Sequence, residues 1–531
     1  MTTPSAGPDQ SVPAASPSGG RAPVGLTKRA LGGMIWTFGG TGVQFVVQML
    51  VIMALGRLLT PNDFGLMTAA GVIIVVSQIV SQIGVGPAIV QRKELNRLHE
   101  RVAFTISGAL GFVLGGVVWV GAPLIAGFYR IPEVEPVLRG IALLFPIDGL
   151  NTVGESLLTR QLRFRLFVTI DVASYIFGYA CVGVILAWQG FGVWALVAAN
   201  IGQVTLRTLG MYVATRHPVR PSLDWHAGRD LLSFGFGHSL AQIGTVLSQQ
   251  GDNMVVGRWL GPTALGIYGR AYGLVVMPAT VFGRIVNRVL FPVMSQVQDE
   301  RNRLAGAYER ALAIVALVSL PTSALLWVVA PEFIPALLGP QWTGVVLPFR
   351  LFTISLLFRM SSQISDACTK AAGAVYSRAL LQGLYAAAVI AGALIGQTWG
   401  VGGVAIAVSV AMGANWITMA ALSRAVTGLS WARFARAHLP GALLAVLVGG
   451  VSLMTAQAAR QAHLGAIAVL ALGTAAAAGL VLLVVLLRLG VLLGPHGTWA
   501  AHQVQQMLRR DARRTGPLGT GDGGLAKASL E

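Results

Sequence analysis

The sequence predicts an all-α polytopic membrane protein of about 14 transmembrane helices, arranged as two pseudo-symmetric six-helix lobes around a central cavity plus two C-terminal helices. Three observations predict this fold. Of the residues, 54% are hydrophobic and 11% are charged, whereas soluble proteins carry about 25% charged residues. The apolar residues form continuous runs of bilayer-spanning length, without the alternation that marks a barrel strand. A stretch at the end of the first run also recurs later in the chain.

The composition divides the chain into five parts. Five prolines among small polar residues predict a disordered cytoplasmic tail over residues 1–28, with no pattern of a secretory signal peptide. We expect an N-terminal lobe over 29–217, a C-terminal lobe over 218–430, two additional helices over 431–494 and a basic cytoplasmic tail over 495–531. The expected spanning runs are 32–58, 65–90, 101–128, 134–158, 164–188, 192–215, 229–256, 264–297, 306–330, 343–372, 374–396, 401–425, 437–459 and 465–493.

The distribution of basic residues predicts the orientation. An even number of spans puts both termini on one side of the membrane. With the termini inside, roughly 27 of the 38 Lys and Arg residues fall on the inner side and roughly six in outer loops. This asymmetry predicts cytoplasmic termini, and it accounts for the net charge of +18 without a nucleic-acid partner.

An internal repeat supports the two lobes. Residues 56–67 read GRLLTPNDFGLM and residues 257–268 read GRWLGPTALGIY. At one constant offset, Gly56, Arg57, Leu59, Pro61 and Gly65 coincide with the same residue types. A unit of six spans gives both copies the same orientation, as in transporters whose two halves move about a central site.

Polar residues at helical spacing mark one face of the first run, and the repeat offset carries this face to the seventh run. Such stripes either bond neighbouring helices or line a hydrated cavity, and the symmetry of the pair favours the cavity. The members are Thr37, Thr41, Gln44 and Gln48 in the first run and His238, Gln242, Thr245 and Gln249 in the seventh, extended by Asp252.

Charged residues also occur inside the runs, where an isolated Arg costs about 2.5–3.5 kcal/mol. Arg284 and Arg288 lie one turn apart in the eighth run, Arg359 lies in the tenth, and Asp148 lies in the fourth. Arg288 is near enough to the inner surface to extend its side chain to the interface. Arg284, Arg359 and Asp148 are too deep for this, so they must pair or face water. An arginine-lined interior suits a phosphate-bearing anion.

Several classes of protein are disfavoured. The chain contains no phosphate-binding loop and no recognised catalytic motif, so we assign no catalytic residue, no metal ligand and no cofactor. Cys181 and Cys368 lie in or beside apolar runs and are expected to be free thiols. Transport is therefore favoured over chemistry.

The run over residues 55–95 resembles bacterial polysaccharide flippases of the O-antigen, colanic acid and teichuronic acid type, within the multidrug/oligosaccharidyl-lipid/polysaccharide exporter superfamily. The resemblance rests on G-R-x-L-x-P-x-x-F-G at Gly56–Gly65 and on the G-x-G-x-A-I-V-Q-like stretch at Gly84–Gln91. It implies a V-shaped pair of lobes in the bacterial inner membrane. It also implies alternating access that moves a lipid-linked oligosaccharide on undecaprenyl diphosphate to the outer leaflet for capsule, exopolysaccharide or O-antigen synthesis. A polysaccharide polymerase and glycosyltransferases are the partners it suggests.

Related lipid II flippases bind the diphosphate with cavity arginines, for which Arg57, Arg284, Arg288 and Arg359 are the candidates here. The alternatives are a lipid II flippase and a drug or cation antiporter on the same fold. An antiporter of this superfamily uses a buried carboxylate in the first or seventh span. The first span here has no acid before Asp63, and the seventh has only Asp230 and Asp252, at its ends, which argues against antiport. A membrane-embedded glycan polymerase would require a long outer loop, which is also lacking.

Overall fold

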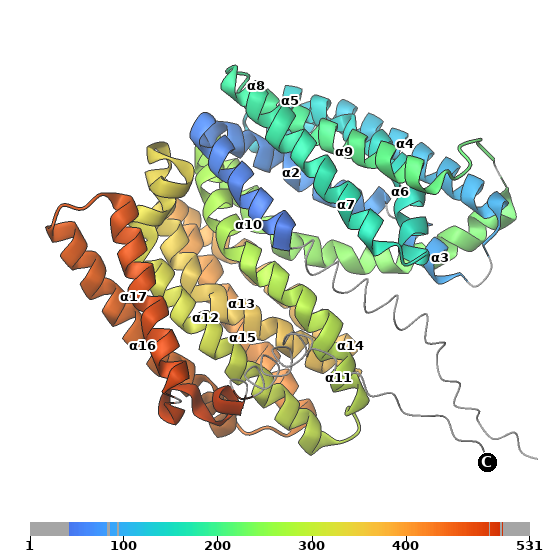
Figure 1. Cartoon of the computed structure of the whole chain (residues 1–531). Coiled ribbons are helices and arrows are strands. Elements are labelled where there is room, and N and C mark those ends of the chain that lie inside the picture. The colour runs from blue at the N-terminus through green and yellow to red at the C-terminus, as the bar shows by residue number, and fades with distance from the viewer. Residues whose placement is uncertain are drawn as a thin grey trace, which may run out of the picture.

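The computed structural model describes residues 42–81, 85–92, 95–222, 224–487, 489–499 and 502; for residues 76–81, 225–248, 284–285 and 375 it describes the backbone alone. Over these ranges the chain is helical and has no strand (Figure 1). Nine of the described segments are long and apolar enough to cross a membrane. The predicted all-α, multi-pass architecture is thus confirmed.

The first half of the described chain forms a group of helices that we call the N-terminal group (Figure 1). Its members are the helix Gly42–Leu58, α2 (Pro61–Ser81), α3 (Val85–Gln91), α4 (Arg97–Tyr129), α5 (Val134–Ala142), α6 (Leu144–Arg160), α7 (Phe164–Tyr175), the π-helix η1 (Ile176–Gly183), α8 (Val184–Trp188) and α9 (Val193–Thr215).

The long helix α10 (Trp225–Ile285) leads into the C-terminal group. Its remaining members are the π-helix η2 (Val286–Leu290), α11 (Phe291–Gln296), α12 (Arg301–Leu338), the 3-10 helix η3 (Pro340–Val345), α13 (Val346–Ala371), α14 (Val375–Gly396), the 3-10 turn η4 (Gln397–Trp399), α15 (Gly400–Thr427), α16 (Trp431–Gln461) and α17 (Ala466–Leu486).

Local sequence signals explain several helix ends. The Asn96 side chain accepts a hydrogen bond of 2.9 Å from the backbone N–H of His99 and so caps α4, and Ser430 caps α16 in the same way. Inside α10 the chain changes direction at Gly261, whose φ of 83° favours glycine. The seventh and eighth predicted runs are therefore two helices that meet at a kink at Gly261 and Pro262, and we call them the first and second arms of α10.

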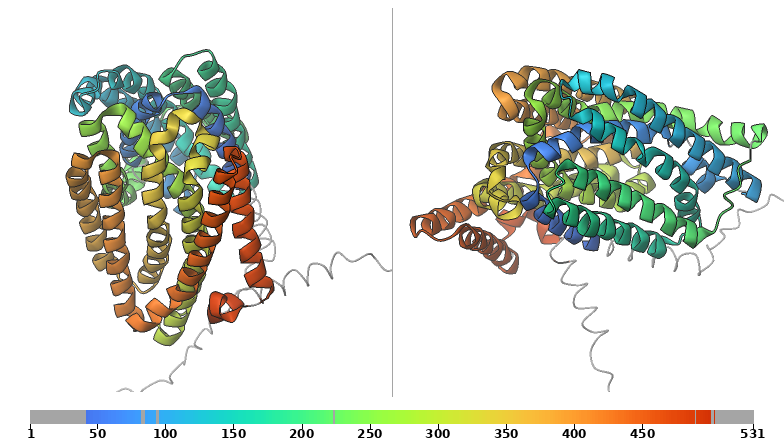
Figure 2. Two further views of the ribbon diagram at one scale, coloured as in Figure 1. Left: turned by 90° about the vertical axis from the view of Figure 1, so that its left-hand side faces the viewer. Right: turned by 90° about the horizontal axis from the view of Figure 1, so that it is seen from above.

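The two groups of helices meet at one end and diverge toward the other (Figures 1 and 2). They meet where α2 crosses α10, and we call the contact made by residues 56–68, 257–269 and 340–342 the junction. There, a Cβ on Gly65 would lie 1.8 Å from the backbone oxygen of Pro262, and a Cβ on Gly266 would lie 1.8 Å from that of Pro61. Only glycine allows this approach at either position.

Side chains of η3 reinforce the junction. The Gly56 carbonyl oxygen accepts hydrogen bonds of 2.7 Å from both Gln341 Nε2 and Trp342 Nε1. The fully buried Trp342 ring also packs edge-on against Phe64 of α2, with the ring centroids 5.3 Å apart. The largest cluster of buried residues accordingly runs without a break from the first helix into the C-terminal group.

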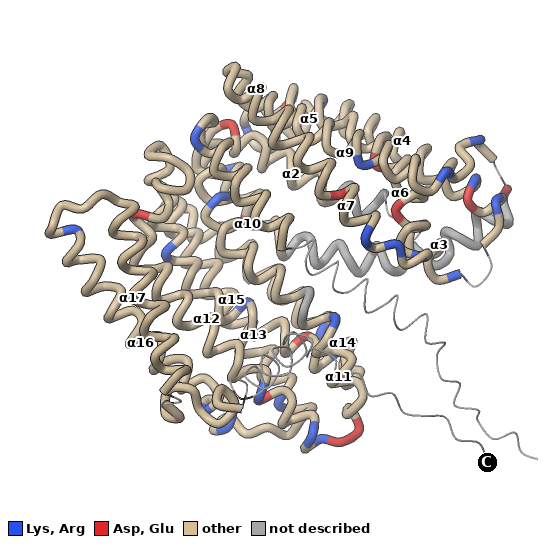
Figure 3. Tube along the Cα trace, viewed as in Figure 1, with Lys and Arg blue, Asp and Glu red and all other residues tan. Residues whose placement is uncertain are grey.

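The helices α16 and α17 lie against α12, on the side of the C-terminal group remote from the N-terminal group (Figure 1). Glu332 of α12 accepts two hydrogen bonds from Arg460, at 2.8 and 2.9 Å, and Glu309 pairs with Arg433 at the other end of α16. Elsewhere, charged residues concentrate toward the ends of the helices (Figure 3). The few within the bundles therefore need a specific explanation.

Candidate functional site

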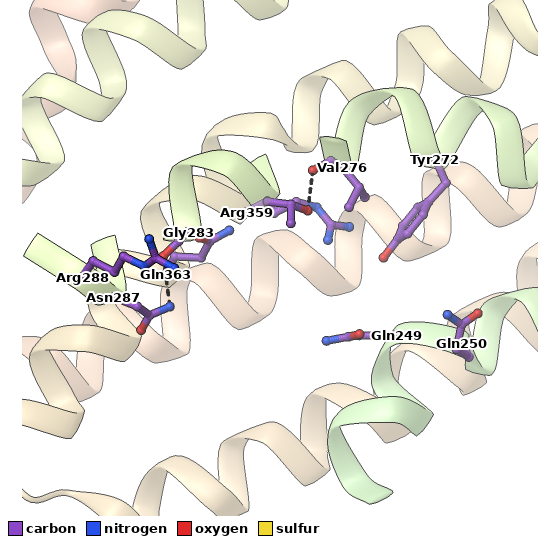
Figure 4. Close-up of a pocket in the computed structure, with 10 residues that line it drawn as sticks. Gln249, Gln250, Tyr272, Val276, Gly283, Asn287, Arg288, Arg359 and Gln363 are labelled. Atoms are coloured by element: carbon purple, nitrogen blue, oxygen red, sulfur yellow. Dashed lines mark hydrogen bonds between the residues drawn. The ribbon is translucent and has the colours of Figure 1, made fainter. Parts of the chain in front are cut away.

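A pocket of about 610 Å³ lies between the two arms of α10 and the middle of α13. Figure 4 shows Gln249 and Gln250 on one side of this space and Tyr272 and Arg359 on the other. Its polar lining residues are Gln249, Gln250, Tyr272, Thr280, Asn287, Arg288, Arg359 and Gln363. Among the described residues, the lining therefore contains two guanidinium groups and no carboxylate.

Arg359 is held by weakly polar partners. Its guanidinium carbon lies 4.8 Å from the ring centroid of Tyr272, and Nη2 lies 3.5 Å from the sulfur of Met412. Nε is buried without a hydrogen-bond partner, and within the described ranges no carboxylate forms an ion pair with this side chain. A cation held over a ring face keeps its N–H donors for an anion.

The wall beside Arg359 is built by close helix packing. Gln363 Nε2 donates a hydrogen bond of 3.1 Å to the Ala279 carbonyl, which ties α13 to α10, while its Oε1 is buried without a partner. A Cβ on Gly283 would lie 2.1 Å from that oxygen, so the glycine permits the approach. The helix then widens to a π-turn at residues 286–290, a feature frequent at functional sites, which carries Arg288 at the pocket.

The structure brings three of the predicted site residues together: Gln249, Arg288 and Arg359 all line the pocket. The side chains of Arg284, His238 and Gln242 lie outside the described residues. Their backbone belongs to α10.

The other four predicted residues lie elsewhere. Arg57 is in the junction, where Nη2 donates a hydrogen bond of 2.7 Å to the Ala336 carbonyl. Gln44, Gln48 and Asp148 belong to the N-terminal group and do not line the pocket. Gln48 and Gln249, the equivalent pair whose side chains are described, therefore have different surroundings.

A cluster of charges occupies the N-terminal group. Nη2 of Arg207 on α9 lies 2.7 Å from Glu155 Oε2 on α6, and its Nε lies 3.4 Å from Asp171 Oδ1 on α7. Gln44 Nε2 donates a hydrogen bond of 3.2 Å to the other oxygen of Asp171. Asp148 is within electrostatic range of Arg207. Arg207 thus pairs with two carboxylates and acts on a third, Asp148. This neighbouring charge explains how Asp148 is tolerated inside the bundle although it does not line the pocket.

Sequence reasoning missed Tyr272, Asp171 and Arg207 as residues of these sites. A tyrosine inside an apolar run gives only a weak signal, because it is tolerated at many helix contacts. Asp171 and Arg207 lie in different runs, and only the folded structure shows that they meet. The sequence analysis also missed Arg270 of α10. Its guanidinium carbon lies 3.8 Å from the ring centroid of Phe64 on α2, a contact that joins the two groups of helices.

Comparison with known proteins identifies the family. Residues 54–347, more than half of the chain, match the family described as polysaccharide biosynthesis protein. The chain is 25% identical over 336 residues to the lipopolysaccharide biosynthesis protein WzxC of Escherichia coli (strain K12), covering 63% of this chain and 68% of WzxC. It is 27% identical over 343 residues to the teichuronic acid biosynthesis protein TuaB of Bacillus subtilis (strain 168), covering 63% of this chain and 70% of TuaB. It is 28% identical over 300 residues to the succinoglycan biosynthesis transport protein ExoT of Rhizobium meliloti (strain 1021), covering 56% of this chain and 60% of ExoT.

Solved structures share the fold at low sequence identity. The lipid II flippase MurJ in an inward closed conformation superposes with a TM-score of 0.64 at 13% identity, over 79% of this chain and 92% of that one. An inward-facing multidrug resistance MATE family transporter of the MOP superfamily gives a TM-score of 0.56 at 18% identity, over 73% and 96%. With the helical fold, the arginine-lined pocket and the matched residues 54–347 in agreement, this chain belongs to the polysaccharide biosynthesis protein family.

Proposed function

We propose that this protein is a flippase of the bacterial inner membrane that moves a polyprenyl-diphosphate-linked oligosaccharide from the cytoplasmic to the outer leaflet. The product would enter capsule, exopolysaccharide or O-antigen synthesis. Membership of the family supports this proposal, as do relatives named for lipopolysaccharide, teichuronic acid and succinoglycan biosynthesis. A polysaccharide polymerase and glycosyltransferases would act on the same lipid-linked chain.

The transport cycle would be alternating access between two six-helix lobes, 29–217 and 218–430, in a protein of 14 spans with both termini in the cytoplasm. In that orientation the junction lies at the outer end of the helices. The groups diverge toward the cytoplasm (Figure 1), so the pocket would receive its cargo from the inner side.

The observation that carries the proposal is the pocket with Arg359 and Arg288 in its wall and no carboxylate among its described lining residues. Guanidinium groups bind phosphate oxygens through paired hydrogen bonds. The amides of Gln249, Gln363 and Asn287 could bind sugar hydroxyls or the remaining phosphate oxygens. We infer that Arg284, one turn before Arg288, belongs to the same anion site.

The direction of transport follows from the charge of the cargo. The cytoplasm is electrically negative, so each negative charge that moves outward gains about 2.3 kcal/mol per 100 mV. A diphosphate could therefore be exported without a second transported ion. The role of the arginines would be to replace the hydration of the phosphates during the crossing.

The test is export in a strain that lacks this gene and carries a variant copy. We expect R359A combined with R284A to abolish surface polysaccharide while the amount of protein in the membrane stays unchanged. R350A is the matched control, because Arg350 lies on the same helix but bonds the Trp327 carbonyl instead of lining the pocket. Unimpaired export by the double variant would refute the assignment.

The alternatives give different results. Deletion of a lipid II flippase would cost viability, whereas deletion of a polysaccharide flippase would remove the glycan alone. A drug or cation antiporter would need carboxylates in its binding pocket. In the part of the chain that the structure describes, the clustered carboxylates lie instead around Arg207 in the N-terminal group. Protection from cationic drugs that depends on Glu155 or Asp171 would favour the antiporter.

A further inference from the structure

A buried carboxylate stands behind the arginine of the pocket. Asp252, on the first arm of α10, is 1% exposed and does not line the pocket. Its Oδ2 accepts a hydrogen bond of 2.7 Å from the Tyr268 hydroxyl, and Oδ1 accepts one of 2.9 Å from the backbone N–H of Asn253. Within the described residues it forms no ion pair. A buried charge of this kind needs a cation in electrostatic range to offset its lost hydration.

A pair of tyrosines lies between Asp252 and Arg359. Tyr268, the donor to Asp252, is stacked on Tyr272 with centroids 6.2 Å apart and an interplanar angle of 13°. Arg359 lies over Tyr272 at 4.8 Å. The carboxylate thus contacts one tyrosine of the pair and the guanidinium contacts the other, and each is among the charges that act on the other.

Few other ionisable groups face this site. Besides Asp252 and Tyr272, only Tyr385 of α14 is among the groups in the described residues that act on Arg359. The ring of Phe352 packs edge-on against both stacked tyrosines, at 5.3 and 5.4 Å, and fixes their positions. The aromatic pair therefore connects Asp252 to Arg359, and within the described residues no ion pair joins these two side chains.

We propose that Asp252 is the fixed counterion of Arg359, a residue that sets how tightly the pocket holds a phosphate. This inference rests on the proposed function and adds the means of release. A carboxylate fixed behind the guanidinium repels the bound diphosphate and lowers the affinity, so that the cargo can leave on the outer side. Because Asp252 makes no salt bridge with Arg359, the N–H donors of Arg359 stay available for the phosphate.

The experiment separates charge from structure with two variants. D252N removes the negative charge but keeps an oxygen that accepts from Tyr268. Y268F removes the hydrogen bond and keeps the charge. Inorganic pyrophosphate is the probe, and calorimetry on the purified full chain at low salt gives its dissociation constant. We expect D252N to bind pyrophosphate at least about tenfold more tightly than the wild type. Y268F keeps the carboxylate but removes one of its two hydrogen-bond donors, so we expect a much smaller rise in affinity.

In cells, we expect the variant with the higher affinity for pyrophosphate to have the lower rate of export. D252N should export surface polysaccharide more slowly than the wild type, since release is impeded, and Y268F should be slowed much less. If D252N does not fold, Asp252→Ala combined with Tyr268→Phe removes both partners of the hydrogen bond and leaves no buried hydroxyl unpaired. The same rise in affinity is expected from that variant.

The outcomes are distinguishable. Equal pyrophosphate affinity in D252N and the wild type overturns the counterion and leaves the proposed function standing, as does an equal rise in D252N and Y268F. If D252N binds pyrophosphate and the wild type does not, the charge of Asp252 opposes anion binding strongly, and the counterion role is supported. If neither protein binds pyrophosphate, the anion site itself is refuted, and the proposed function and this inference fail together.

Discussion

Arg207 is the single residue on which the charge cluster of the N-terminal group depends. It pairs with Glu155 and Asp171, and its side chain is 23% exposed. Truncation would leave partly buried carboxylates without a counterion. We expect R207Q to lower the free energy of unfolding by about 1–3 kcal/mol, measured by thermal unfolding in detergent.

A surface pair provides the control for Arg207. Arg303 and Glu300 are also paired, but their side chains are 65% and 54% exposed. Exposed pairs contribute about 0–1 kcal/mol, so R303Q should scarcely change the unfolding temperature. Equal losses in R207Q and R303Q would show that water screens the inner cluster as well.

His217 makes stability depend on pH. It follows α9, is 5% exposed, and its Nδ1 lies 3.0 Å from the Thr215 hydroxyl. Burial lowers the pKa of His217 below its ordinary value. The unfolded chain therefore takes up a proton that the folded chain resists, and stability falls as the pH drops below about 6.5. Thermal unfolding of the wild type and H217Q between about pH 8 and about pH 5 should show a steeper acid loss in the wild type. Parallel curves would contradict this.

Among the residues of the candidate site, the sequence draws attention to charged and polar residues inside apolar runs. Arg359 stands out because charge deep in an apolar run is costly, and Gln249 because it shares a helical face with other polar residues; both line the pocket. The helical period gives the face of a residue but not the helix that it meets. For this reason the sequence could not predict that Gln44 bonds Asp171.

Among the elements, the crossing of α2 and α10 is the most tightly constrained. Alanine at Gly65 or Gly266 would place a methyl group 1.8 Å from a backbone oxygen of the facing element, and backbone cannot move aside as a flexible side chain can. We expect G65A and G266A each to lower stability by about 1–3 kcal/mol, measured as a fall in unfolding temperature.

The same helices offer matched controls. Gly71 lies on α2 and Gly273 on α10, and a Cβ at either position would meet no atom within 4 Å. G71A and G273A should be neutral or stabilising, because alanine favours the helix by about 0.5–1 kcal/mol. If G71A and G273A lost as much stability as G65A and G266A, the close approach at the crossing would not be the cause of the loss.

At the scale of elements, the spacing of apolar runs predicts most helices. The pause near residues 257–263 separates two runs in the sequence, and the structure has non-helical backbone there, at Gly261. The π-turns at 176–183 and 286–290 were not predicted, since an extra backbone residue in a helical turn leaves no signal in hydropathy.

For the whole molecule, the repeat meets itself at the junction. Gly65 faces Gly266, and Thr68 faces Gly269, each pair at the constant offset of the sequence repeat. Equivalent residues touch each other only near a two-fold axis. The sequence predicted the repeat and the matching orientation of its copies. It could not predict that the two motifs contact one another, because similarity between segments contains no information about their distance.

The contact between Thr68 and Gly269 allows the two groups to be cross-linked at the junction, which would block the transport cycle. A Cβ on Gly269 would lie 3.8 Å from the Cβ of Thr68, the separation typical of a disulfide, about 3.8 Å. The double variant T68C/G269C, in a background with the exposed Cys181 replaced by serine, should therefore form a bond between the two groups. If the outer end must open for release, oxidation abolishes polysaccharide export, and a reductant restores it. Each single cysteine variant should export normally under both conditions, while mass spectrometry of the double variant reports the bond. Full export by cross-linked protein would mean that the cargo leaves without separation of the groups at the junction, and alternating access about this axis would be wrong.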